Sequence, residues 1–579
     1  MTTNERTRST PKRLTGSGPA PSIAFLVDHL DDSRYHWQIL RGAMDAAYDR
    51  GANLVCFVGG ALAPADQPSD ANRVFDLARP KNADAVIVLS GSIGNLVGSD
   101  ALATYCERYR PAPTCSIALP LRGLSSVCID NESGMRAAVE HLVRAHSHKR
   151  IAFVRGPAAN DEAELRLRVY REVLEQNGLP YAPELVVPGD FTMPAGHQAV
   201  TTLLVDRKLP TSEVQAIVAA NDGMALGVLD ELRKLGVRVP EQIAVVGFDN
   251  VEEARFVLPP LTTVSQPLQD QGREAVRIVL EQLRARSAPE NAVRHTELVT
   301  RRSCGCLQGS STRKSSNPPA GLGFDAALIR RRQHILADMA RAAAGSLGPA
   351  GAQWDLRLLN AAAEQIRGDS PDSFIRAYDE VLRRLVSAGG DPAVCTEVVS
   401  AMRGRVVRCI GDLKQRTTAE DMFHEARIMT TSAVERLHVT REMKVWSDAR
   451  GLMDAGSAIM AARDMNELSR AVHDQLPRTG IARCFILRFS GGGAQVLLAE
   501  KPDARRSDPT LTTMYPANDV LRHAVLTGTD EHAFAVFPMK ASDGYAALVL
   551  ELSGAFEGHA YEMLRQIFAT TLARMSPAI

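Results

Sequence analysis

Short apolar runs that alternate with amphipathic helical stretches constrain the first half of this chain more than any other feature. The first run is IAFLVD (Ile23–Asp28), a helical pattern follows at Gln38–Arg50, and the next run is NLVCFVGG (Asn53–Gly60). Apolar runs of this length are typical of strands buried on both faces, and a helix between two of them indicates a βαβ unit. The pattern predicts an α/β fold with parallel sheets.

The alternation continues to about residue 302. Short runs rich in β-branched residues and bounded by turn residues predict further strands at AVIVLS (Ala85–Ser90), TCSIAL (Thr114–Leu119), RIAFVRG (Arg150–Gly156), AIVAAN (Ala216–Asn221) and IAVVGFDN (Ile243–Asn250). Helices are predicted between them at Gly134–Ala145, Ala163–Asn177 and Gly223–Leu235.

The remaining boundaries follow from shifts in composition. The chain has 579 residues, enough for three to five domains at roughly 100–200 residues each. We expect a disordered polar tail over 1–20, an α/β domain over 21–308 and a linker rich in Ser, Gly and Pro over 309–323. A helical region over 324–463 and a small α+β domain over 464–579 complete the predicted order.

The helical region includes a long run from Thr418 to about Ala462. Apolar residues at helical spacing form a rough stripe along it: Met422, Ala426, Met429, Ala433, Leu437 and Met443. Such a stripe predicts a helix that packs on a core, and a signalling coiled coil is the alternative interpretation.

Charge and cysteine content limit the functional classes. Lys and Arg number 67 and Asp and Glu number 67, so the formal net charge is zero, and a purely electrostatic nucleic-acid binder is disfavoured. The basic residues of the tail (Arg6, Arg8, Lys12, Arg13) precede no apolar stretch, which predicts neither a secretory signal nor a membrane segment. Nine cysteines without a regular framework favour reduced thiols and a cytoplasmic location.

One long segment carries a family resemblance. VAANDGMALGVLDELRKLGVRVPEQIAVVGFDN, followed by PPLTTVSQPLQDQG (Val218–Gly272), closely resembles the ligand-binding domain of the LacI/GalR family, which shares its fold with type I periplasmic sugar-binding proteins. The segments at Cys128–Pro157, Ala163–Leu179 and Leu298–Cys306 agree with it. The resemblance implies two doubly wound α/β lobes joined by crossover strands, with a small sugar-like ligand in the cleft between them.

The resemblance also implies ligand contacts. Arg166, Asn221, Asp249 and Gln266 match polar positions that contact the ligand in the family, and Tyr35 and Ser133 match a ring contact and a polar contact of the first lobe. Arg and Asp can bracket vicinal hydroxyls with charge-assisted hydrogen bonds. The competing interpretation is that Asn221, Asp222 and Asp249 only cap helices and turns, and for Asp222 we expect the cap.

The sequence departs from the family before and after this domain. LacI/GalR regulators begin with a helix-turn-helix ahead of the first strand, whereas here the first strand is predicted to begin at Ile23, so we expect this chain to lack that DNA-binding motif. The helical region and a GAF-like segment at 464–579 resemble bacterial sensors that pair such a domain with a GGDEF or histidine-kinase output. No GGDEF-like signature is present, and SGGGAQ (Ser490–Gln495) lacks the acidic residues that hold Mg²⁺.

No catalytic or metal-binding motif stands out. There is no G-x-S-x-G elbow and no phosphate-binding glycine loop, so we expect no enzyme and no cofactor. The C-x-C pair Cys304 and Cys306 has too few ligands for a tetrahedral metal site unless others arrive from elsewhere. His141, His146 and His148 form an equally weak group, and we assign no metal from the sequence.

The sequence therefore predicts a cytoplasmic, non-enzymatic sensor of a sugar-like small molecule. Lobe closure is relayed through the helices to the GAF-like segment, and the chain acts as a homodimer with a separate output protein in transcription or second-messenger control. The alternatives are a regulator that contacts DNA through an unrecognised segment and a scaffold with a degenerate sensor.

Overall fold

The computed structural model describes residues 20–30, 34–63, 69–306, 323–343, 346–501, 513–526, 532–541, 544–553, 556 and 558–575. The chain divides into two compact units, Met1–Ser310 with Gly451–Ile579, and Ser311–Arg450. The polar tail predicted at 1–20, except residue 20, and the linker predicted at 309–323, except residue 323, lie outside the described residues.

A parallel sheet forms the first lobe of the first unit. Its strands are in the order β11-β5-β4-β3-β1-β2, and every neighbouring pair is parallel. Their bounds are β1 (Ser22–Val27), β2 (Asn53–Val58), β3 (Ala85–Leu89), β4 (Thr114–Ile117), β5 (Ser125–Ile129) and β11 (Asn291–Arg294).

A second sheet forms the second lobe, in the order β12-β10-β9-β8-β6-β7, with β12 antiparallel to β10 and the rest parallel. Its strands are β6 (Ile151–Val154), β7 (Val186–Val187), β8 (Ala216–Ala219), β9 (Ala244–Asp249), β10 (Thr262–Ser265) and β12 (Glu297–Val299). The chain passes between the two sheets after β5, after β10 and after β11. The predicted two-lobed α/β fold with parallel sheets is confirmed.

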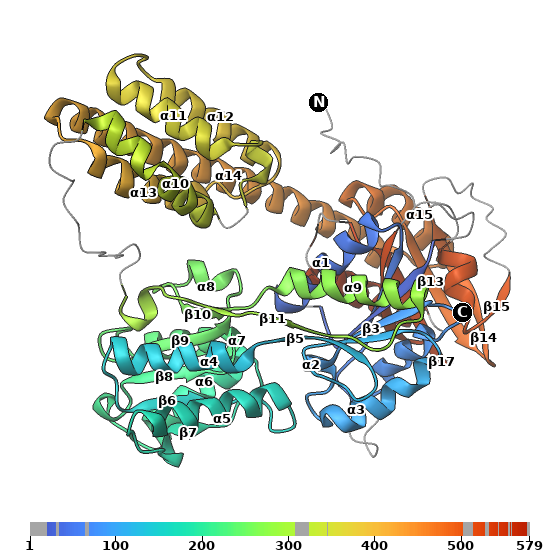
Figure 1. Ribbon diagram of the computed structural model, residues 1–579. Coiled ribbons are helices and arrows are strands. Elements are labelled where there is room, and N and C mark those ends of the chain that lie inside the picture. The colour runs from blue at the N-terminus through green and yellow to red at the C-terminus, as the bar shows by residue number, and fades with distance from the viewer. Residues whose placement is uncertain are drawn as a thin grey trace. The chain divides into compact units, whose positions relative to one another are not determined.

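Helices cover these sheets. In the first lobe they are α1 (Arg34–Asp49), α2 (Ser90–Ile93), α3 (Gly98–Cys106) and α9 (Leu268–Ala285), and Figure 1 shows α1 and α9 side by side. In the second lobe they are α4 (Asn131–Glu140), α5 (Asp161–Gln176), α6 (Met193–Val200), α7 (Asp222–Lys234) and α8 (Glu253–Phe256).

The C-terminal segment extends the sheet of the first lobe. Strand β16 pairs in parallel with β2, so that Val536 lies opposite Phe57, and four antiparallel pairings continue the sheet in the order β16-β17-β13-β14-β15. The elements of this segment are α15 (Met465–Gln475), β13 (Cys484–Ser490), β14 (Gly493–Glu500), β15 (Met514–Pro516), β16 (Ala533–Ala541), β17 (Gly544–Glu551) and α16 (Gly558–Met575).

The hydrophobic core is continuous across this junction. On one face of the sheet Phe25 and Ile87 of the first lobe share a cluster with Leu548 and Phe568 of the C-terminal segment. The ring of Trp37 on α1 lies 6.2 Å from that of Tyr561 on α16. The segment that the sequence presents as a separate domain therefore shares a sheet and a core with the first lobe.

The second unit is helical. Its elements are α10 (Phe324–Ala343), α11 (Trp354–Arg367), α12 (Ser373–Ser387), α13 (Val394–Val406) and the first part of α14 (Leu413–Ala461), and Figure 1 shows them as a bundle. Met422 and Ala426 are buried in its core, whereas Met443 is 70% exposed, so only the first part of the predicted stripe is covered. Among the described residues no helix is long and apolar enough to cross a membrane.

Candidate ligand-binding site

Arg166 is held by groups from three parts of the second lobe. It lies on α5, whose first turn is capped by the Asn160 side chain, and it is only 3% exposed. Its Nε donates to Asn131 Oδ1 at 2.8 Å and its Nη1 donates to the Ala220 carbonyl at 2.7 Å. Its guanidinium carbon lies 3.9 Å from the centre of the Phe248 ring. The side chain is therefore oriented before any ligand binds.

Glu162 and Asn131 complete the surroundings of this arginine. Asn131, the first residue of α4, donates to Glu162 Oε1 at 2.7 Å, and that oxygen lies 3.8 Å from Arg166 Nη2. Both side chains are buried. Glu162 precedes Arg166 by one helical turn, so the two lie on the same face of α5. The sequence analysis selected neither residue, although this spacing is visible in the sequence.

Asp249 ends β9 and lies next to Gln266. Gln266 Nε2 donates to Asp249 Oδ1 at 2.5 Å, and Gln271 Nε2 donates to Gln266 Oε1 at 3.0 Å. The φ angle of Asp249 is 130°, a conformation that non-glycine residues rarely adopt and that is often found at functional sites. Burial raises the pKa of Asp249 well above its usual range, and Asp222 raises it further, against the lowering effect of Arg166.

Tyr35 is a residue of the first lobe that interacts electrostatically with these charged side chains of the second lobe. It lies in the first turn of α1 and is partly buried. Burial raises its pKa well above the ordinary value, and the nearby carboxylates of Glu162 and Asp249 raise it further while Arg166 lowers it. The phenol therefore lies within electrostatic range of the same three charged groups. We name Tyr35, Asn131, Glu162, Arg166, Asp249 and Gln266 the polar cluster.

Asn221 and Ser133 have different surroundings. Asn221 caps α7 by accepting from the Met224 amide at 3.0 Å, and its Nδ2 donates to the Phe191 carbonyl at 2.9 Å. Ser133 is exposed, and its amide donates to the capping residue Asp130 at 3.0 Å. Of the six residues selected from the sequence, the structure brings together Tyr35, Arg166, Asp249 and Gln266.

The expectation that Asp222 caps a helix is wrong, because Asn221 holds that position. The fully buried Asp222 carboxylate instead accepts from the Thr263 hydroxyl at 2.6 Å and from the Val251 amide at 3.0 Å. It thus ties α7 to β10 and to the loop after β9. Burial raises its pKa to about 6 against these hydrogen bonds.

The sequence analysis also did not select Asp28, whose carboxylate lies directly after β1. Asp28 Oδ2 lies 2.8 Å from His29 Nδ1, and Oδ1 lies 3.3 Å from His36 Nε2. Burial alone would raise the pKa of Asp28, but His36 and His29 outweigh it and hold the pKa well below its usual range. An acidic residue that directly follows an apolar strand was the signal that could have identified it.

The two lobes touch through Asn160. Its Nδ2 lies 3.0 Å from the Gly91 carbonyl and 2.8 Å from Asn95 Oδ1, both in the first lobe. Asn160 begins α5, the helix that carries Arg166. A contact between the lobes therefore lies within two helical turns of the polar cluster.

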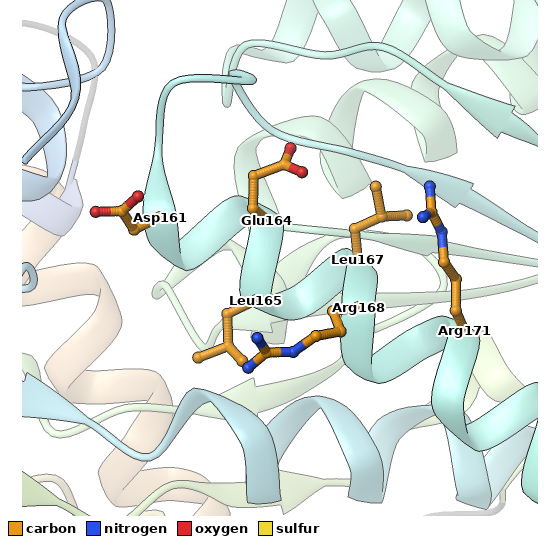
Figure 2. Close-up of a pocket in the computed structure, with 6 residues that line it drawn as sticks. All are labelled: Asp161, Glu164, Leu165, Leu167, Arg168 and Arg171. Carbon is orange, nitrogen blue, oxygen red and sulfur yellow. The ribbon is translucent and has the colours of Figure 1, made fainter.

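A surface hollow on α5 is separate from this cluster. It is lined by Asp161, Glu164, Leu165, Leu167, Arg168 and Arg171. Figure 2 shows that all six come from one helix and that Leu165 and Arg168 point away from Glu164 and Leu167. Side chains that diverge in this way do not converge on a ligand, and the polar cluster is the better candidate site.

The polar cluster has the chemistry to bind a hydroxyl-rich molecule. A guanidinium supplies donors in a fixed fork, carboxylates supply acceptors, and the rings of Tyr35 and Phe248 supply apolar surface. Two α/β lobes with such groups between them define the class of two-lobed small-molecule binding domains.

Comparisons with known proteins agree with this class. The family described as periplasmic binding protein-like domain matches residues 139–304. The HTH-type transcriptional repressor CytR of Escherichia coli K12 is 31% identical over 287 residues, which are 49% of this chain and 80% of CytR. The HTH-type transcriptional regulator CelR of Thermobifida fusca is 39% identical over 188 residues, 32% of this chain and 54% of CelR.

Two further relatives complete the comparison. The ribose operon repressor of Escherichia coli K12 is 29% identical over 271 residues, 46% of this chain and 77% of the repressor. A solved transcriptional regulator CelR–cellobiose complex is 30% identical, covers 49% of this chain and 86% of its own, and superposes with a TM-score of 0.43. On the match to CytR, this chain belongs to the LacI/GalR family of regulators.

Proposed function

We propose that this protein senses a small, polyhydroxylated, sugar-like molecule bound at the polar cluster. The observation that carries the proposal is the convergence of Arg166, Glu162, Asp249 and Gln266 with Tyr35 from the other lobe. A neutral ligand suits a site in which buried carboxylates already face a buried guanidinium. The name of the ribose operon repressor supports a ligand of the sugar class.

Ligand binding favours the closed arrangement of the lobes. The cluster has groups from both lobes, so a ligand that contacts all of them binds the closed form better than an open one. The Asn160 contact with Gly91 and Asn95 stabilises the same arrangement. Ligand binding thereby changes the orientation of one lobe relative to the other.

The C-terminal segment receives this change through the first lobe. Because β16 pairs with β2, a rotation of the first lobe moves the segment with it. We propose that the GAF-like segment and the helices then present this change to a separate output protein in transcription or second-messenger control.

A homodimer along α14 fits the exposed residues of that helix. Val439, Trp446, Met453 and Met460 are 53%, 72%, 59% and 43% exposed and recur every seven residues. Apolar residues at one position of a seven-residue repeat are one half of the a and d pattern of a coiled-coil seam. A second copy of the same helix would cover it.

Direct DNA binding is the second candidate function. CytR and CelR are HTH-type regulators by name, and this observation favours it. The neutral net charge counts against a binding mode that depends on charge alone. Binding of the full chain to DNA around its own gene, weakened by added salt, would support this candidate over the output-protein proposal.

A thermal-shift screen of the full chain tests the sensing proposal. The panel contains sugars, sugar acids, nucleosides and purines, since a ligand that binds only the folded state raises the melting temperature. We expect a hit among the sugar-like compounds. No hit in the panel would favour the alternative of a scaffold with a degenerate sensor.

A further inference from the structure

Four side chains with metal-binding atoms converge in the second lobe, away from the polar cluster. They are His141, His146, Cys304 and Cys306, and one ligand atom of each lies within 4.8 Å of the others. His141 begins the short π-helical segment η3 (His141–Ala145), which continues α4. It is ten residues beyond Asn131, or about 15 Å along the helix from the polar cluster.

Four of the six distances between these atoms are short and similar, and the other two are within 4.8 Å. His141 Nε2 lies 3.2 Å from His146 Nε2 and 3.4 Å from the sulfur atoms of both Cys304 and Cys306. His146 Nε2 lies 3.4 Å from Cys306 Sγ. All four atoms therefore surround one small volume.

Hydrogen bonds do not account for this arrangement. A neutral imidazole nitrogen has either one proton or one lone pair, so it makes one strong hydrogen bond. His141 Nε2 faces three polar atoms at 3.2–3.4 Å. A central cation is the partner that two imidazole nitrogens and two thiolates can share.

We propose that these residues form a tetrahedral zinc site with two cysteine and two histidine ligands. Zinc–nitrogen bonds of about 2.0–2.1 Å and zinc–sulfur bonds of about 2.3 Å at tetrahedral angles separate two nitrogens by about 3.3 Å, and a nitrogen from a sulfur by about 3.5 Å. The four distances above lie within about 0.2 Å of these separations. Two soft thiolates with two imidazoles favour Zn²⁺ over Mg²⁺ or Ca²⁺.

The backbone conformation between the two cysteines favours this arrangement of the four ligand atoms. Gly305 has a φ of 102°, and a Cβ at this position would lie 3.3 Å from His146 Cε1. A left-handed residue between the two cysteines turns both sulfurs to the same side, and glycine also leaves room for the imidazole. The Thr262 hydroxyl lies 3.0 Å from Cys304 Sγ, where it can donate to a thiolate.

The site is structural. Four protein ligands leave no open position for a substrate or an activated water. The metal joins η3 and the residue after it to η7 (Arg302–Cys304) and the residues after it, two parts of the chain about 160 residues apart. It therefore holds residues 304–306, at the end of the two-lobed domain, against η3.

Zinc analysis of the wild-type full chain is the first test. After purification with zinc present and dialysis against metal-free buffer, we expect about one zinc per chain by elemental analysis. X-ray absorption at the zinc edge is expected to show sulfur and nitrogen neighbours in equal number, at about 2.3 Å and 2.0–2.1 Å. Less than about 0.2 zinc per chain, or a shell of oxygen atoms only, would overturn the proposal.

Matched variants locate the metal. Cys306→Ser and His146→Gln are expected to lose the zinc, whereas Cys128→Ser and His197→Gln keep it, because Cys128 and His197 lie in the same domain but outside the four-residue cluster. Zinc retained in both cluster variants would contradict the proposed ligands. The spectrum of the wild-type protein tests the site even where a cluster variant fails to fold.

Discussion

Arg166 shows what the family resemblance could and could not predict at the scale of one residue. Its position was predicted, because the resemblance aligns it within a long ordered segment. Its fixed partners were not, since Asn131 and the Ala220 carbonyl come from other strands and helices, 35 and 54 residues away. A sequence pattern reports helix faces and strand ends, whereas such contacts depend on tertiary packing.

The histidine and cysteine cluster shows the same limit. A C-x-C pair is two ligands short of a tetrahedral site, and nothing in the spacing of His141 and His146 connects them to residues 304 and 306. Only the packing of η3 against the end of the domain brings the four together.

Asp222 gives a prediction about pH at the same scale. Its folded pKa of about 6 is above the ordinary 3.8, so between these values the folded chain holds a proton that the unfolded chain has lost. The free energy of unfolding should therefore fall as the pH rises through this window, by roughly 1–3 kcal/mol. Asp222→Asn should flatten this dependence, and urea unfolding between pH 4 and pH 7 measures it. An equal slope in wild type and variant would contradict the assignment.

At the scale of elements, the longer apolar strands of the first domain were predicted, whereas β5, β7 and the short polar strands were not. The seven predicted strands correspond to β1, β2, β3, β4, β6, β8 and β9. β10, β11 and β12 have the sequences TTVS, NAVR and ELV, which are too short and too polar to stand out. Their neighbours in the sheets, rather than their own propensity, make them strands.

Gly558 tests the packing of α16 on the first lobe. A Cβ on this residue would lie 1.8 Å from the Leu30 carbonyl oxygen, so Gly558→Ala must push the helix away. We expect a loss of roughly 1–3 kcal/mol, read as a lower melting temperature and faster proteolysis of the C-terminal segment.

Gly451→Ala is the matched control for this change. Its added Cβ meets only Thr479 Cγ2 at 3.8 Å, and alanine is the better helix former. An unchanged melting temperature and proteolysis rate for Gly558→Ala would show that α16 does not pack closely on the first lobe.

At the scale of the whole molecule, the continuous sheet was beyond prediction from the sequence. The β2–β16 pairing joins residues nearly 480 positions apart, with His532 donating its amide to Asn53 and accepting from the Leu54 amide. Arg522 forms an ion pair with Asp84 at 2.9 Å across the same junction. The sequences of β2 and β16 are each typical of an ordinary strand and do not indicate that the two pair. The C-terminal segment was therefore predicted as a domain of its own.

The proposed homodimer depends on the exposed residues of α14. If a second copy covers the exposed stripe, Trp446→Glu places a charge in the seam and should convert the dimer to a monomer by light scattering. Val445→Glu, at a residue that is 64% exposed but outside the seven-residue repeat, should leave the dimer intact. If the Trp446→Glu variant remains a dimer, the dimer interface does not lie along this part of α14.

Calorimetric titration of the full chain with its thermal-shift ligand tests the sensing account most directly. Arg166→Ala should weaken binding by about 100-fold, because removing a buried charged donor loses roughly 3 kcal/mol. Arg168→Ala, on the same helix with a side chain that is 67% exposed, should bind like wild type. Arg166→Ala that remains folded and binds with unchanged affinity would contradict the assigned site.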